Sequence, residues 1–223
     1  MHQRKSKKVL IYFLLLIVVS SIGNYSINNL KFRKIQNINI SGLDEKNIQI
    51  LLNKIKDLNL KNIFFLNEYE IIKILNSNNL IESYKVFKKY PSELDVDIKK
   101  TTFLAKINIE GKEYLIGSNR KFSKNNYSNK NLPYIFGNPK ISEFFDFKKI
   151  LDQSPIAYEE IKSFYFFQSK RWDLKMKNGL LIKLPAVSIQ DVLSDVSAFL
   201  TQNNLNQLKT IDVRVKNQII VNE

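Results

Sequence analysis

Carboxylates are the residues of this sequence that occur in pairs suited to acid–base chemistry. Glu159 precedes Glu160, and Asp95 and Asp97 alternate in a strand-like segment. Two carboxyl groups can act as general acid and general base when their surroundings separate their pKa values. Asp95 and Asp97, however, share one face of an exposed strand. We therefore interpret them as solvated side chains, and the grouping of Asp152 with the two glutamates is a weaker candidate still.

Other catalytic chemistries lack the residues that they need. The single histidine is His2, cysteine is absent, and the 6 glycines do not cluster. This excludes Cys–His and Ser–His–Asp catalysis, the usual zinc sites and Gly-rich phosphate loops. Trp172 shares a strand face with Leu174 and Met176, which favours core packing. We predict that the protein is not an enzyme and has no cofactor, metal site or small-molecule substrate.

The N-terminus indicates the compartment. The apolar run Val9–Ile22 follows a basic cluster made of Arg4, Lys5, Lys7 and Lys8, as in a signal peptide or a membrane anchor. Extending the run to Ile27 reaches the roughly 20 residues of a spanning helix. A cleaved signal ending near Ser20–Gly23 is the alternative. We predict a cytoplasmic tail at 1–8, a transmembrane helix at 9–27 and a linker at 28–34, with the rest of the chain outside.

Composition predicts packed domains rather than a nucleic-acid binder. Lys and Arg total 35 against 21 Asp and Glu, which gives a net charge of +14, and 44% of the residues are hydrophobic. The basic residues are spread along an Asn- and Ile-rich chain, so they indicate a codon bias rather than a binding patch. The exported part is long enough for one large or two small domains.

The first of these domains reads as strand, helix, helix, strand, strand. Asp44 is a helix N-cap, and Asn67 with Glu70 resembles a capping box. Two helices on one face of a small sheet make an α+β unit. The expected elements are a strand at Ile38–Ile40, helices behind Asp44 and Asn67, and strands at Leu80–Lys88 and Leu94–Lys99, joined by the turn Pro91–Ser92.

The second domain reads mostly as strands, with a polar loop at Ser118–Lys130. Asn178–Gly179 is the strongest hairpin signal. The expected strands are Thr102–Ile109, Glu113–Ile116, Ile161–Gln168, Arg171–Lys177, Leu180–Leu184, Thr210–Val215 and Gln218–Val221. The expected helices are Ser142–Leu151 and one that begins at Ser188 with an amphipathic pattern.

Two motifs carry a family resemblance. Phe32, Ile40 and Gly42 belong to an F-x-x-I-x-x-I-x-I-x-G pattern that also contains Ile35 and Ile38. Tyr90, Pro91 and Leu94 form an aromatic–Pro–x–x–Leu core. Both resemble motifs of the FtsQ/DivIB family of bacterial cell division proteins. The full second motif in this sequence also contains Leu80, Ile81, Tyr84, Val86 and Lys88 before this core, and Val96 and Ile98 after it.

Weaker matches follow in the family's order, and one motif departs from it. The family's E-R-x-P-x-A junction keeps only Ala105, so the motif does not fix the domain boundary near 100–105. The further matches are Leu115–Ile116 with Phe122, Leu132–Pro133 with Gly137, Arg171–Trp172, Asn178–Gly179, Leu184–Pro185, and the closing Ile211, Asp212, Val213 and Arg214.

The resemblance implies an α+β protein with three parts. A single N-terminal transmembrane helix would precede a POTRA domain (β-α-α-β-β) at 35–101. A mostly antiparallel FtsQ-type β domain with a few helices would follow at 102–223. Such a protein is a single-pass type II protein of the cell inner membrane at the division septum. Because a cleaved binder would not be held at the septum, the resemblance favours a retained anchor.

The resemblance also implies a non-enzymatic divisome scaffold that binds other division proteins in the periplasm. The β domain would bind FtsB, and with it FtsL, by adding a partner strand to an open edge. We place this edge in Thr210–Val221, although its valines could instead only fill the core. The alternative function is a POTRA-containing periplasmic chaperone or assembly factor of the envelope. The candidate partner-binding residues are Ile211, Val213, Arg214, Val215, Ile219 and Val221.

Overall fold

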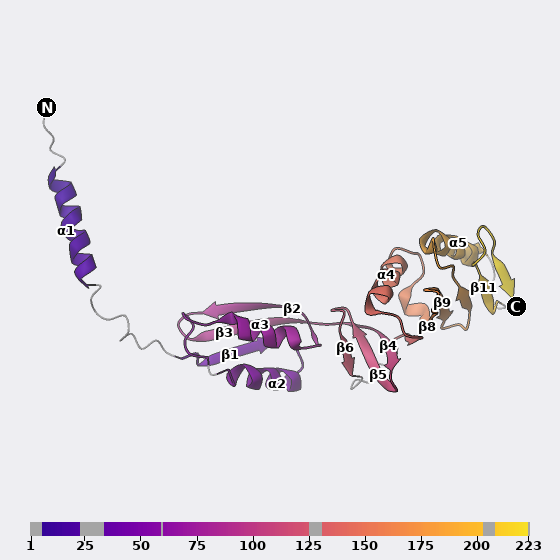
Figure 1. Cartoon of the computed structure of the whole chain (residues 1–223), viewed down its shortest axis with the longest axis horizontal. Coiled ribbons are helices and arrows are strands. Elements are labelled where there is room, and N and C mark those ends of the chain that lie inside the picture. The colour runs from indigo at the N-terminus through magenta and orange to yellow at the C-terminus, as the bar shows by residue number, and fades with distance from the viewer. Residues whose placement is uncertain (1–5, 23–33, 59, 125–130, 203–207, 223) are drawn as a thin grey trace, which may run out of the picture. The chain divides into compact units, whose positions relative to one another are not determined.

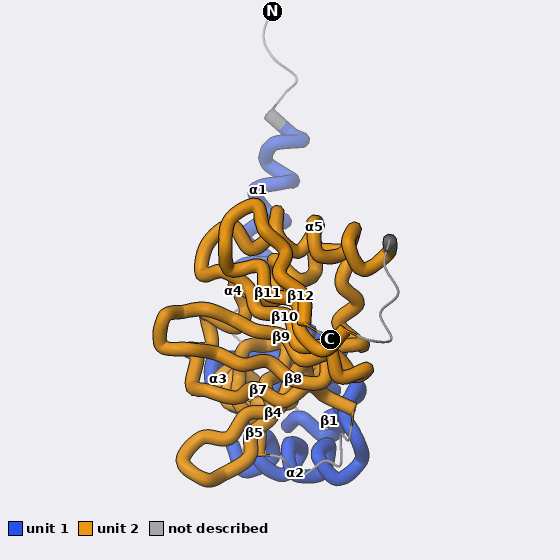
Figure 2. Tube along the Cα trace, turned by 90° about the vertical axis from the view of Figure 1, so that its right-hand side faces the viewer, with its two compact units in different colours: residues 1–71, 85–97 blue, residues 72–84, 98–223 orange. Residues whose placement is uncertain are grey.

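The computed structural model describes residues 6–22, 34–58, 60–124, 131–202 and 208–222. The chain divides into two compact units, shown in Figure 2. Unit 1 contains residues 1–71 and 85–97, and unit 2 contains residues 72–84 and 98–223. Helices and strands are mixed throughout, which confirms the predicted α+β class.

The N-terminal helix α1 covers Ser6–Ile22, 17 residues. Its apolar side chains from Val9 to Val19 are all exposed. The predicted extension of the helix to Ile27 lies outside the described residues, as does Phe32 of the first motif. Among the residues that the structure describes, no helix has both the length and the apolar content required to cross a membrane.

A three-stranded sheet in the order β1-β3-β2 follows the N-terminal helix along the chain. Strand β1 is parallel to β3, with Ile38 opposite Leu94 and Ile40 opposite Val96. The elements come in the expected order of strand, helix, helix, strand, strand (Figure 1). They are β1 (Asn37–Ser41), α2 (Glu45–Lys56), α3 (Glu68–Ser77), β2 (Ile81–Lys89) and β3 (Glu93–Lys100).

The two helices begin where the sequence signals predict. Asp44 is the extended N-cap of α2 and accepts hydrogen bonds from the Asn47 side chain at 2.9 and 2.7 Å. The Asn67 carboxamide oxygen accepts the Tyr69 N–H at 3.1 Å just before α3. The buried apolar side chains of unit 1 are Leu51, Ile55, Ile63, Ile71, Leu94 and Val96.

The second sheet has nine strands in the order β12-β11-β10-β9-β8-β7-β4-β5-β6. Five neighbouring pairs are antiparallel, and the pairs β4–β7, β7–β8 and β10–β11 are parallel. The strands are β4 (Phe103–Ile109), β5 (Lys112–Gly117), β6 (Phe122–Lys124), β7 (Tyr134–Phe136), β8 (Ile161–Phe166), β9 (Trp172–Met176), β10 (Leu181–Lys183), β11 (Thr210–Asp212) and β12 (Ile220–Asn222).

The predicted loop at Ser118–Lys130 is wrong over part of its length, because β6 lies within it. Phe122 pairs with Ile116, and its ring meets Tyr114 edge-on with centroids 6.3 Å apart. Apolar contact with β5 thus converts a polar segment into a short strand. Residues 125–130 lie outside the described residues.

Helices α4 (Ile141–Asp152) and α5 (Ile189–Gln202) supply the core of the larger sheet, and a 3-10 turn, η2, covers Tyr158–Glu160. Phe144 and Phe147 of α4, with Leu193 and Val196 of α5, belong to one buried cluster. Trp172 stacks on Phe147 in this cluster, with ring centroids 4.7 Å apart and ring planes 2° from parallel. This confirms the predicted core role of Trp172.

Residues 72–84 belong to unit 2 because polar side chains fasten them to the turn after β5. The Asn119 carboxamide donates to the carbonyl oxygens of Asn79 and Ile81, both at 2.9 Å. Ser118 donates to the Glu82 carboxylate at 3.0 Å, and Lys99 contacts the same carboxylate at 3.1 Å. The compact units divide after residues 71, 84 and 97, and the domain boundary between 101 and 102 stays a prediction.

Candidate interaction edge

The sheet of unit 2 ends at β12, which makes this strand the candidate interaction edge. Strand β11 lies between β10, to which it is parallel, and β12, to which it is antiparallel. Within the described residues no strand pairs with the outer side of β12. Such a strand presents a row of backbone N–H and C=O groups to a further strand. Because β11 is paired on both sides, β12 is the outer strand.

The six candidate residues fall into two environments. Ile211 and Val213 are buried in the core cluster. Val215, Ile219 and Val221 are exposed, and Arg214 is exposed beside them. The predicted edge Thr210–Val221 therefore contains one core strand, a turn and one outer strand. Val215 lies in the turn, where its carbonyl oxygen accepts the Gln218 N–H at 3.2 Å.

A groove of about 470 Å³ runs between α5 and the turn that joins β11 to β12. Phe199 of α5 and Ile219 contribute apolar surface to it. An apolar groove next to an open strand suits a partner that adds a strand and inserts a side chain. The groove is lined by Val192, Asp195, Ala198, Phe199, Val213, Val215, Asn217, Gln218 and Ile219.

An ion pair fixes the polar face of the hairpin. The Arg214 guanidinium donates from Nε to Asp212 Oδ1 at 2.8 Å and from Nη2 to Oδ2 at 2.5 Å. These bonds lower the pKa of Asp212 and raise the pKa of Arg214. Asp212 of the closing family motif thus holds the Arg214 side chain in a defined orientation just after β11.

The sheet face opposite the helices carries a basic recess of about 310 Å³. Its floor includes Asp173, which is buried and accepts from Arg171 Nε at 3.1 Å and from the Leu184 N–H at 3.3 Å. Burial raises the pKa of Asp173, although Arg171 opposes the shift. The recess is lined by Tyr165, Phe167, Arg171, Asp173, Lys175, Leu181, Lys183 and Arg214.

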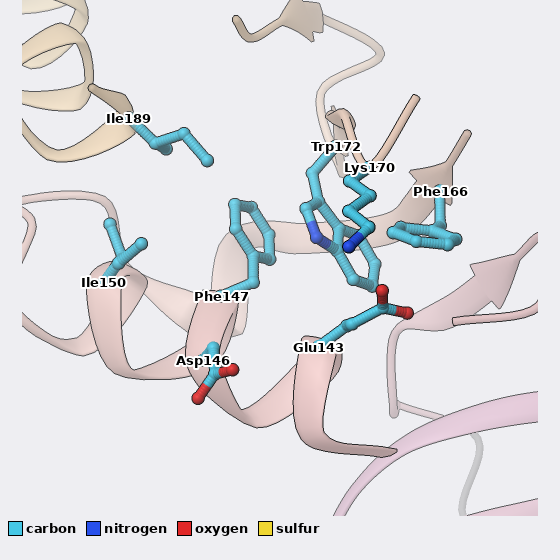
Figure 3. A pocket seen from close by; sticks show the side chains of 8 residues that line it. All are labelled: Glu143, Asp146, Phe147, Ile150, Phe166, Lys170, Trp172 and Ile189. Carbon is cyan, nitrogen blue, oxygen red and sulfur yellow. The ribbon is translucent and has the colours of Figure 1, made fainter. Parts of the chain in front are cut away.

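A third hollow, of about 260 Å³, opens over the Trp172–Phe147 stack. Figure 3 shows Glu143 and Lys170 near the Trp172 ring, and Ile150 and Ile189 beyond Phe147. The stacked rings of this hollow belong to the core, and its lining supplies no nucleophile with an adjacent base. We therefore interpret this hollow as a rim of the core rather than an active site.

The carboxylate pairs lie apart from these features. On the outer face of the small sheet, Asn39 donates to Asp95 at 2.9 Å and Ser41 donates to Asp97 at 2.8 Å. Glu159 and Glu160 are exposed on the 3-10 turn. In the part of the chain that the structure describes, no three Asp, Glu, His or Cys side chains are grouped to hold a metal ion.

The remaining motif residues lie in turns or next to strand ends. Gly42 and Gly179 have positive φ angles of 92° and 96°, which suit glycine in turns. Tyr90 and Pro91 are joined by a cis peptide bond in the turn between β2 and β3. Pro185 lies two residues after the end of β10.

Sequence reasoning missed Ile220 and the groove residues of α5. Ile220 is exposed on β12, opposite Asp212. Val192 and Phe199 fit the apolar face of an amphipathic helix, and that pattern indicates core packing. The sequence contains no signal that separates the covered part of this face from the part that lines the groove.

Comparisons with known proteins agree with the predicted family. The family model "Cell division protein FtsQ/DivIB, C-terminal" matches residues 105–214. A cell division protein FtsQ of Rickettsia bellii is 29% identical over 194 residues, which cover 84% of this chain and 72% of the relative. An FtsQ of Bradyrhizobium diazoefficiens is 23% identical over 163 residues, which cover 71% of this chain and 48% of the relative.

A solved structure also matches. It is the major extracytoplasmic domain of the bacterial cell division protein DivIB from Geobacillus stearothermophilus. The TM-score is 0.34 at 15% identity, with 47% of this chain and 97% of that chain covered.

Proposed function

Since the chain belongs to the FtsQ/DivIB family of cell division proteins, we propose that it is a non-enzymatic scaffold of the division machinery. In this proposal it holds a partner along the outer side of β12. The observation that carries the proposal is the pairing order β10-β11-β12, with Ile219, Ile220 and Val221 exposed at the end of the sheet. The expected partner is FtsB, and FtsL through it.

The physical basis of binding is β-augmentation. A partner strand would pair with the N–H and C=O groups on the outer side of β12, and its side chains would cover the exposed apolar residues. The groove beside Phe199 would receive an apolar anchor of the partner. Arg214 is exposed near this edge and already oriented by Asp212, so it would select a partner with a carboxylate.

We also propose that α1 anchors the chain in the inner membrane with its N-terminus in the cytoplasm. The described helix α1 is itself too short to span, so this proposal requires the spanning segment to continue toward Ile27, as the sequence predicts. Exposed apolar side chains along the helix are costly in water and favourable in lipid. Lys7 and Lys8 at its start favour the cytoplasmic side.

The small sheet with α2 and α3 would then be a POTRA domain, followed by the β domain. The proposed boundaries remain 35–101 and 102–223, as the resemblance implies. Polar bonds from Asn119 to the segment before β2 would make the start of this strand a shared element of the two domains.

Proline substitutions on β12 test the binding edge. Successive N–H groups of a strand point in opposite directions, one toward β11 and the next toward the outer side. Only one of Ile220 and Val221 therefore directs its N–H to the outer side, and proline at that position removes a hydrogen bond to the partner but none to β11. This variant should keep its melting temperature and bind FtsB about tenfold more weakly. The other variant loses a bond to β11 and should melt earlier.

Binding is measured by titration of purified full-length protein with FtsB, and folding by thermal unfolding. Val221→Lys, which leaves the backbone intact and places a charge on the apolar side of the edge, is the second variant and should also weaken binding. Unchanged FtsB affinity in Val221→Lys and in the proline variant that keeps its melting temperature would refute the proposal. A midcell band of a fluorescent fusion is the expected localisation, and a uniform envelope signal would contradict the division role.

A further inference from the structure

Unit 1 exposes a cluster of aromatic side chains that the proposed function does not use. Phe64, Phe65, Tyr69 and Tyr90 are 50%, 70%, 63% and 62% exposed. The rings of Phe64 and Tyr90 are in contact, with centroids 4.9 Å apart. We call these four residues the aromatic end. Exposed clusters of aromatic side chains often mark interaction surfaces, because leaving these large apolar rings in water is unfavourable unless a partner covers them.

The aromatic end lies where the chain from α1 enters the domain of the small sheet. Lys34 forms a β-bridge with Asn62, two residues before Phe64. The Ile35 N–H donates to the Lys61 carbonyl oxygen at 3.2 Å, which joins the entering chain to the same loop.

The start of β1, the end of β2 and the start of β3 lie together at this entry point. The Gln36 N–H donates to the Ser92 carbonyl oxygen at 2.9 Å, next to the turn that holds Tyr90. Lys88 and Glu68 form an ion pair at 2.8 Å, which brings the first turn of α3 and Tyr69 to the end of β2. Figure 1 shows β2 ending and β1 beginning at the same end of the sheet.

The length of the intervening chain limits how far this end can be from α1. Residues 23–33 separate Ile22 from Lys34. A chain of this length spans at most about 40 Å when fully extended. If α1 lies in a bilayer, the aromatic end therefore remains within that distance of the lipid surface, and a tethered surface needs little intrinsic affinity to be occupied.

We infer that the aromatic end docks the small sheet with α2 and α3 onto the lipid headgroup region of the membrane that holds α1. Aromatic rings favour the membrane–water interface, where an apolar body and a polar edge are both accommodated. Lys34 and Lys61 are exposed beside the rings and suit anionic headgroups. The inference rests on the proposed anchorage of α1, and it assigns the partner of this face as lipid rather than protein.

Depth-dependent quenching in the full chain tests the inference. The chain has no cysteine, so one introduced cysteine carries one fluorophore. Glu70→Cys places the label in the first turn of α3, beside the aromatic end. Glu45→Cys is the matched control, because it replaces a glutamate in the first turn of α2, beyond the far end of β1. Both proteins are reconstituted into phosphatidylethanolamine–phosphatidylglycerol vesicles that contain a headgroup-level nitroxide lipid.

The Glu70 label should be quenched and the Glu45 label should not. Adding Phe65→Ser and Tyr69→Ser should reduce quenching at position 70 to the level of the Glu45 control. Ile50→Ser, which removes another exposed apolar side chain of unit 1, should leave the quenching unchanged.

Vesicle flotation separates the two possible failures. Protein that floats with the vesicles while both labels show equal, weak quenching overturns the docking and leaves the anchor in place. Protein that does not float overturns the anchorage, and the docking with it. If the double variant fails to fold, the comparison of the Glu70 and Glu45 labels in otherwise unchanged chains still decides the inference.

Discussion

Replacing Phe147 by alanine should destabilise unit 2 by about 4 kcal/mol. Phe147 is 2% exposed, stacks on Trp172 and meets Phe164 edge-on with centroids 6.1 Å apart. Burial of one aromatic side chain contributes about 1.5–3 kcal/mol. Each aromatic pair adds about 0.5–1.5 kcal/mol, and the cavity left behind raises the cost further. The loss is a large part of the roughly 5–15 kcal/mol that stabilises a typical protein.

The loss of stability can be measured without a label, because the tryptophan fluorescence of the protein comes from a single residue, Trp172. Urea unfolding followed by Trp172 fluorescence should show a midpoint lowered by about 2 M, for a slope near 2 kcal/mol per M. Phe167→Ala is the matched control, since this phenylalanine is 38% exposed and contacts Arg171 rather than the core. A Phe147→Ala midpoint within about 0.5 M of wild type, equal to roughly 1 kcal/mol, would refute the account of the core.

Two further perturbations test the sheet of unit 2. Burial raises the pKa of Asp173 above that of an unfolded aspartate, so its contribution to stability is present below the unfolded pKa and is lost as pH rises through the folded pKa. Asp173→Asn should remove this fall from the pH profile of urea midpoints, and an unchanged profile would contradict it. Gly137→Ala should destabilise strongly, because a Cβ would lie 2.3 Å from the Phe166 carbonyl oxygen. Gly179→Ala, where nothing lies within 4 Å, should cost only the strain of its positive φ, and equal melting temperatures would refute the clash.

Elements with strong local signals could be predicted from the sequence. The β9–β10 hairpin is specified by Asn178–Gly179, and α5 by its apolar periodicity. Strands β6 (Phe-Ser-Lys) and β7 (Tyr-Ile-Phe) are short and show no repeated apolar–polar alternation in the sequence. Strand β7 exists because it pairs in parallel with β4 on one side and β8 on the other. Such pairing is non-local, so it leaves no local pattern in the sequence.

The interaction edge shows the same limit in a more specific form. Local alternation predicts a hairpin in Thr210–Val221, and the structure contains one. Which strand is the outer one depends on the parallel pairing of Leu181 with Thr210, across a separation that includes all of α5. The local pattern therefore locates the hairpin but cannot assign Ile211 to the core and Ile220 to the edge.

The register of this hairpin explains why a core residue and an interface residue have the same sequence signature. Ile211 and Val221 are direct cross-strand partners, so both side chains lie on the face that α5 covers. Ile211 is 0% exposed, whereas Val221 is 43% exposed. The apolar face of the sheet thus continues by one strand beyond the layer that buries it. An added partner strand would extend the backbone ladder and the buried face together, which is why the proposed partner must bring an apolar residue opposite Val221 as well as a strand.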